Sequence, residues 1–188
     1  MKRMMKLLVA ALVVAMVSLA VTPDAVAREK KVKSPCSREG RSTSEEIRAY
    51  ATGSSVNVEA ARQKALASAR TTLAANIDVL LKMVNENYIS SYELDADEEY
   101  RSSFNQVGRN VVQKALHFAI PICDEVLQDT KTKQYKVHVA LRLAGKEIAK
   151  IYEESLGIDQ KLRTDFEREK FYKIFNEEME NFAKQQNQ

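Results

Sequence analysis

Apolar and polar residues alternate most regularly between residues 135 and 143. The apolar positions are Tyr135, Val137, Val139, Leu141 and Leu143, and the positions between them are Lys136, His138, Ala140 and Arg142. Successive side chains of a strand point to opposite faces of a sheet. A period of two therefore predicts a strand here with one buried face.

A weaker alternation precedes this strand. Its apolar positions are Phe118, Ile120, Ile122 and, later, Val126, and Pro121 lies among them. Because proline cannot donate a hydrogen bond to a neighbouring strand, this stretch is predicted to be an edge strand or to contain a bulge. The polar residues 128–134 are predicted to connect the two strands as a hairpin.

A third strand is predicted over residues 46–52, where Ile47, Ala49 and Ala51 share one face. The small alanines on that face predict that a helix lies close above it. Asn57 is the expected N-cap of this helix. Its apolar stripe extends to about residue 88 and consists of Ala61, Ala65, Ala69, Leu73, Ile77, Leu80 and Val84.

Two further regions show helical spacing. The first, residues 98–116, carries Phe104, Val107, Val111, Val112 and Ala115. The second begins at about Lys146, is interrupted at Gly157, and continues in a helix that Asp159 is expected to cap. The sequence thus predicts an α+β fold: a small antiparallel sheet of about three strands, with helices packed on one face and long C-terminal helices. The expected organisation is an α+β domain over residues 45–144 and a C-terminal helical extension over residues 145–188.

The beginning of the chain has the pattern of a secretory signal peptide. Lys2, Arg3 and Lys6 precede an apolar run, and Ala25-Val26-Ala27 matches an A-x-A cleavage site. The run is shorter than the ~20 residues that span a bilayer. We therefore expect residues 1–27 to be removed and the protein to be periplasmic or secreted, with no stable transmembrane span and with outer-membrane association left open. A retained anchor is the alternative, since basic residues follow the site.

Residues 28–44 are charged and contain Pro35 and Gly40. Such a composition buries little apolar surface and predicts a flexible tether. Removing residues 1–27, which hold three Lys or Arg and one Asp, lowers the net charge from +3 to +1. Without a clustered basic face, a nucleic-acid partner is excluded.

The chain has two cysteines, Cys36 and Cys123. Export would place both in an oxidising compartment, where a disulfide between them can persist. Sequence alone does not give the Cα separation that pairing requires. One buried and one exposed thiol therefore remain the alternative.

Gly53 lies between a predicted strand and a predicted helix, as glycines of phosphate-binding loops do. Such loops need further glycines or a lysine at fixed spacing, and these are missing here. We therefore expect Gly53 only to turn the chain, in a conformation that other residues resist.

No other motif indicates catalysis or a metal. His117 and His138 lack a third ligand at metal spacing and are predicted to be exposed or at the rim of the sheet; a metal shared between them is the alternative. The acidic residues 95–99 lack the glycine of a calcium loop. No serine or cysteine has a recognisable base partner. The sequence thus predicts no cofactor and no catalytic residue.

The C-terminal helix carries a stripe of aromatic residues, Phe166, Phe171, Phe175 and Phe182. Such a stripe is typical of a core face. Because it lies at the chain end, after the strand patterns, it is also a candidate surface for a protein partner that binds a helix in a groove.

Residues 47–77 resemble the opening of the small bacterial envelope lipoproteins often called Lpp-twenty-like, and of the amino-terminal domain of the flagellar assembly protein FlgT. In both, a strand ending in Ala-x-Gly leads into a helix of the form Ala-Arg-x-x-Ala-x-x-x-Ala. The corresponding residues here are Ala51, Gly53, Ala61, Arg62, Ala65 and Ala69. Residues 126–143 resemble the closing hairpin of the family.

The resemblance covers about residues 45–143. It implies an α+β domain exported to the cell envelope, with no known catalytic residues to carry over. The chain differs from the lipoproteins because no lipid-attachment cysteine stands at the signal boundary.

These observations predict a non-enzymatic envelope protein that acts as a protein-interaction or assembly module. The alternative is a module that binds a small ligand or peptidoglycan in a cleft between the sheet and the helices. The side chains expected to serve such a cleft are Arg48, Tyr50, Tyr135 and Arg142.

Overall fold

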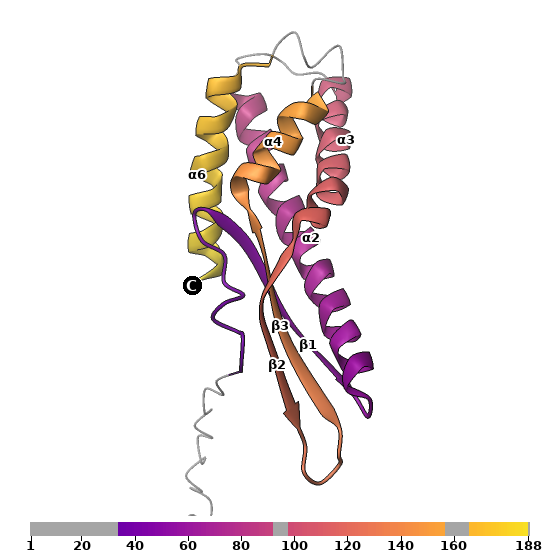
Figure 1. The fold of residues 1–188 in the computed structure, drawn as a ribbon. Coiled ribbons are helices and arrows are strands. Elements are labelled where there is room, and N and C mark those ends of the chain that lie inside the picture. Colours follow the sequence, from indigo (N-terminus) through magenta and orange to yellow (C-terminus); the bar gives the residue numbers. More distant parts are fainter. Residues whose placement is uncertain (1–33, 92–97, 157–165, 188) are drawn as a thin grey trace, which may run out of the picture. The chain divides into compact units, whose positions relative to one another are not determined.

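The computed structural model describes residues 34–91, 98–156 and 166–187. Their elements, in chain order, are β1 (Glu46–Ser55), α2 (Val58–Ser90), α3 (Glu98–Ala115), the 3₁₀ turn η1 (Leu116–Phe118), β2 (Ile120–Gln128), β3 (Tyr135–Ala144), α4 (Gly145–Leu156) and α6 (Arg168–Gln186). Figure 1 shows the hairpin of β2 and β3, with α2 running along the sheet. The predicted α+β class is confirmed.

The three strands form one antiparallel sheet in the order β1-β3-β2. Both β1 and β2 pair with β3, so the strand with the clearest alternation lies in the middle. The register of β2 shifts between Pro121 and Cys123. The prediction from Pro121 is therefore confirmed in both its forms, an edge strand and a bulge. Phe118, in contrast, lies in η1 rather than in the strand.

The predicted one-sided burial of β3 is wrong. Val137, Val139, Leu141 and Leu143 are buried towards the helices, as expected. On the other face, His138 and Ala140 are buried as well. The N-terminal segment, residues 34–44, lies over that face and covers them, since Cys36 Sγ is 3.5 Å from the carbonyl oxygen of His138.

The close approach of a helix to β1 is confirmed, but Gly53 does not turn the chain. It lies within β1 and its φ is not positive. A Cβ atom added at Gly53 would lie 2.2 Å from the carbonyl oxygen of Ala61 and 2.5 Å from the amide nitrogen of Ala65. The glycine is needed because the backbone of α2 occupies the space of a side chain.

Helix α2 begins as predicted. The side chain of Asn57 accepts a hydrogen bond from the backbone N–H of Ala60, and satisfies one of the free donors at the helix start. The predicted stripe is buried throughout and consists of Ala61, Ala65, Ala69, Leu73, Ile77, Leu80 and Val84. The first, alanine-rich half of α2 packs on the sheet, and the second half packs against α3 and α6.

Helices α4 and α6 belong to the same compact unit as the sheet. Helix α4 packs on α3, and α6 packs on α2. Their buried residues, among them Ile148, Tyr152, Phe171 and Phe175, are part of one core with the strands. The described part of residues 145–188 is thus not a separate extension. Gly157 and Asp159, expected to break and restart the helix, lie outside the described residues.

The tether predicted over residues 28–44 is wrong for the described part, which begins at residue 34. Cys36 and Ser42 are almost fully buried. A covalent bond and long-range hydrogen bonds hold this segment, as described below. The signal peptide and residues 28–33 lie outside the described residues. In the part of the chain that the structure describes, no helix is long and apolar enough to cross a bilayer.

Candidate functional site

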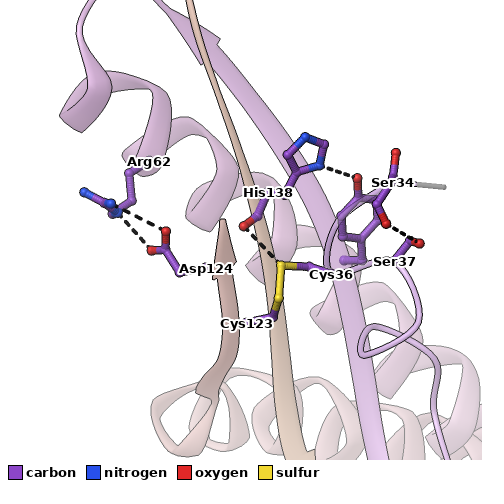
Figure 2. The surroundings of a disulfide bond; sticks show 8 residues. Ser34, Cys36, Ser37, Arg62, Cys123, Asp124 and His138 are labelled. Atoms are coloured by element: carbon purple, nitrogen blue, oxygen red, sulfur yellow. Dashed lines mark hydrogen bonds and ion pairs between the residues drawn. A yellow bond between two sulfur atoms is a disulfide. The ribbon is translucent and has the colours of Figure 1, made fainter. Parts of the chain in front are cut away.

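A disulfide joins Cys36 of the N-terminal segment to Cys123 of β2 (Figure 2). The two residues are 87 positions apart in sequence, and their Cα atoms are 5.5 Å apart. The bond therefore ties the start of the folded unit to an edge strand. Cys36 has a φ of 60°, in the left-handed region that residues other than glycine rarely adopt. The bond and the buried position hold that conformation.

His138 lies beneath the N-terminal segment. Only 2% of its surface is exposed, so the prediction of an exposed or rim position is wrong. Its Nδ1 atom lies 2.8 Å from the Tyr50 hydroxyl, and its Nε2 atom has no hydrogen-bond partner among the residues that the structure describes. Burial lowers the pKa of the imidazole, nearby Lys136 lowers it further, and Glu125 opposes the change. Burial therefore favours the neutral form of the His138 imidazole.

We expect the free energy of unfolding to fall as the pH drops below about 6.5, where the unfolded imidazole begins to bind a proton. The folded state takes up that proton only at lower pH, because its pKa is depressed. A His138→Gln variant, whose amide can still accept from Tyr50, is expected to lose this slope in urea titrations between pH 7.5 and 5.5. Glu46, whose pKa is also lowered, titrates below that window.

His117 supplies the control for this prediction. Its Nδ1 atom lies 3.2 Å from the carbonyl oxygen of Gln113, and the residue is exposed. His117→Gln is expected to keep the slope of the unmodified protein. An unchanged slope in His138→Gln would contradict the assignment. The two histidines are not cross-strand neighbours, and no group of three metal-ligating side chains occurs among the described residues.

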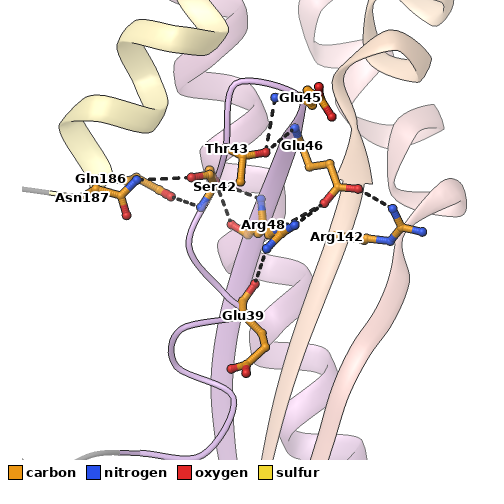
Figure 3. A network of polar contacts seen from close by, with 9 residues as sticks. All are labelled: Glu39, Ser42, Thr43, Glu45, Glu46, Arg48, Arg142, Gln186 and Asn187. Atoms are coloured by element: carbon orange, nitrogen blue, oxygen red, sulfur yellow. Dashed lines mark hydrogen bonds and ion pairs between the residues drawn. The ribbon is translucent and has the colours of Figure 1, made fainter.

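A polar network surrounds the start of β1 (Figure 3). The Glu46 carboxylate accepts hydrogen bonds from Arg48 Nη2, at 2.6 Å, and from Arg142 Nη1. Burial alone would raise the pKa of Glu46, but the hydrogen bonds and charges of Arg142 and Arg48 outweigh it, so the pKa lies below its usual value. The two arginines stand opposite each other in the register of β1 and β3.

The N-terminal segment also covers the outer edge of β1. The backbone N–H of Arg48 donates to Ser42 Oγ at 2.9 Å, and Asn76 of α2 donates to the Arg48 carbonyl at 2.9 Å. The backbone of Ser42 in turn contacts the C-terminal end of α6, through Gln186 and Asn187. The first part of this edge, from Glu46 to Arg48, is therefore occupied.

The cleft predicted between sheet and helices is wrong. Arg48, Tyr50 and Arg142 alternate with the buried apolar residues, so they lie on the sheet face away from α2. Tyr135 is on the opposite face, paired with Ser55 at the far end of β1, and packs against the core. Tyr135 lies five to seven strand positions from the other three side chains and on the opposite face, so the four cannot line one cleft between sheet and helices.

The partner surface predicted on the C-terminal phenylalanines is also wrong. Phe171, Phe175 and Phe182 are buried, and Phe166 is half-buried. The Phe171 ring lies parallel to that of Tyr152, with centroids 4.8 Å apart, and meets Tyr88 at 6.0 Å. The stripe is covered by α2 and α4, which accounts for its helical spacing.

A hollow of about 400 Å³ opens between the ends of β1 and β3, the start of α4 and the middle of α6. Its apolar lining includes Phe175, Met179 and Ala149, all buried. Its polar lining consists of Ser44, Glu45, Glu46, Arg142, Lys146, Tyr172 and Asn176. Of the four residues predicted to serve a cleft, only Arg142 lines this hollow, which lies at the ends of the strands and not between the sheet and α2.

The outer edge of β2 is the second open feature. No strand among the described residues pairs with it. Among the described residues, few large apolar side chains have more than a third of their surface exposed. Most of them belong to this region, namely Phe118 (53%), Ile120 (50%), Val126 (38%) and Leu127 (48%), and the others are Val56 and Val79. Residues 118–127, together with the outer backbone edge of β2, are called the β2 edge below.

Comparison with known proteins adds no assignment, because neither a family model nor a curated protein matches the chain. The resemblance to envelope lipoproteins and to FlgT stays a prediction. Sequence reasoning did not identify Lys146 or Leu127 as site residues. The only available signal for Leu127 was an apolar residue next to a polar hairpin loop, on a strand whose proline predicts an edge.

Proposed function

We propose that the protein is an exported, non-enzymatic envelope protein that binds a partner protein by adding one of the partner's strands to the β2 edge. Export is supported by the leader pattern of residues 1–27. The disulfide between Cys36 and Cys123 also supports it, since such bonds persist in oxidising compartments.

The observation that carries the proposal is the contrast between the two sheet edges. Ser42 and Asn76 satisfy backbone groups on the outer edge of β1. The outer edge of β2 receives no strand from the described residues, and apolar side chains flank it at both ends. An open edge offers backbone hydrogen bonds to an extended segment, and alternate side chains supply specificity.

The charge of β2 selects the partner. Asp124 is paired with Arg62 of α2, but Glu125 lies on the other face, and an antiparallel pairing of two copies about Glu125 would place two like carboxylates opposite each other. A second copy is therefore disfavoured. An extended segment that alternates apolar and basic side chains would place its bases on the face of Glu125 and its apolar groups on the other face, beside Val126. We commit to this class of partner.

Two synthetic peptides test the proposal: four repeats of Val-Lys, and four repeats of Val-Glu as the control. The experiment uses the chain from Arg28 onwards, the product expected after removal of the signal peptide. We expect Val-Lys to slow amide hydrogen exchange within residues 120–128, and Val-Glu to leave it unchanged. The double variant Glu125→Lys/Leu127→Lys should bind Val-Lys about tenfold more weakly, because both positions lie on the face that meets the peptide's lysines and both pairings become repulsive.

Val79→Lys is the matched control, since Val79 is 46% exposed but lies on α2. This variant should bind the peptide as the unmodified protein does. Equal protection by both peptides, or protection outside residues 120–128, would refute strand addition at this edge. Sedimentation that shows a dimer dissociated by Leu127→Lys would replace the proposed partner with a second copy.

A further inference from the structure

The hollow at the start of α4 has unsatisfied positive charge on one wall. Arg142 gives one of its N–H groups to Glu46, which also accepts from Arg48. Lys146 makes no hydrogen bond or ion pair with any described residue. Glu45 is on the rim and exposed. Among the lining residues Arg142 and Lys146 balance Glu45 and Glu46, and Arg48, which donates to Glu46 from outside the lining, brings the net charge of this group to +1.

The opposite wall is apolar. Phe175 and Met179 of α6 and Ala149 of α4 line the hollow with almost no other exposure. Gly145 keeps this wall open, because a Cβ atom there would lie 2.8 Å from Met179 Cε. Tyr172 is not a free donor, since its hydroxyl donates to Glu153 Oε2 at 2.9 Å. The polar wall therefore acts through Arg142 and Lys146.

From this division we infer that the hollow binds a small amphiphilic carboxylate, with its acid group between Arg142 and Lys146 and its aliphatic part against Phe175 and Met179. The volume of about 400 Å³ falls within the range of sites that hold small molecules. Helix α4 begins at Gly145, beside both cations, and its dipole adds to their attraction for an anion. This site is separate from the β2 edge.

Octanoate is the probe, with octanol and octylamine as matched controls of equal chain length. We expect octanoate to raise the melting temperature of the protein that begins at Arg28 and to shift the NMR signal of the Met179 methyl group. Octanol and octylamine are expected to do neither. Titration calorimetry should show at least tenfold weaker octanoate binding in Lys146→Gln, since hydrogen bonds to charged groups contribute that much.

Lys150→Gln, one turn further along α4 and paired with Glu154, is the control and should bind as the unmodified protein does. Arg142→Gln should weaken binding similarly. Because Arg142 also donates to Glu46, this variant can disturb the polar network, whereas Lys146→Gln removes a cation without that side effect. Octanol binding as tightly as octanoate would show a merely apolar hollow. Octanoate binding that Lys146→Gln leaves unchanged, or no binding at all, would overturn the inference.

Discussion

Replacing Cys36 and Cys123 by serine is expected to lower the free energy of unfolding by about 4.5 kcal/mol. The bond closes a loop of 87 residues, and cross-linking so long a loop removes much of the entropy of the unfolded chain. It also holds the N-terminal segment over His138 and Ala140. We expect the double variant to lose protection from amide exchange in this segment before the core strands lose theirs.

Urea denaturation with and without a dithiol reductant measures this effect. The reductant should bring the unmodified protein close to the stability of the Cys36→Ser/Cys123→Ser variant and leave the variant unchanged. Intact mass should rise by two daltons on reduction, the mass of the two hydrogens gained. Two thiols that react with an alkylating agent before reduction would contradict the bond.

Phe171→Ala is expected to cost about 3–5 kcal/mol, the usual range for deleting a buried aromatic ring. Phe171 is fully buried, and its ring contacts those of Tyr152, Tyr88 and Phe175. It therefore joins α6 to α2 and α4. A surface for a partner, in contrast, could lose this ring with little change in stability.

Phe118→Ala is the matched control, since the Phe118 ring is half exposed and belongs to the β2 edge. Its loss should change the free energy of unfolding by less than about 0.5 kcal/mol, as surface substitutions usually do. Urea denaturation of both variants checks the pair. Similar effects of the two substitutions would contradict the placement of α6 in the core.

The local patterns predicted the elements well because each depends on neighbouring residues. The alternation from Tyr135 to Leu143 predicted β3, Asn57 predicted the start of α2, and Pro121 predicted an irregular edge strand. The alanines of β1 and α2 also predicted the close packing of these elements. Each of these signals is contained within a few turns or strand positions.

The failures share one physical cause, contacts between residues far apart in sequence. Ser42 is held by Arg48 nearby but also by Gln186 and Asn187, about 145 positions away. A polar, charged stretch thus became an ordered segment. His138 was predicted to be exposed because its own strand pattern points it outwards, and the segment that covers it begins about 100 residues earlier.

The aromatic stripe of α6 shows the same limit. Helical spacing identifies an apolar face, but not what covers it. Gly53 shows a related ambiguity, because a single glycine serves a turn or a close approach equally well in sequence. The hollow could not be predicted at all, since its walls come from four elements: β1, β3, α4 and α6.

Photocrosslinking in living cells tests the central proposal most directly, namely that a partner binds at the β2 edge. A photoreactive phenylalanine analogue is placed at Leu127 in one variant and at Val79 in another, two positions of nearly equal exposure. The account predicts a discrete adduct with one protein from position 127, lost when Glu125→Lys is added, and none from position 79. No adduct from position 127, or the same adducts from both positions, would contradict it.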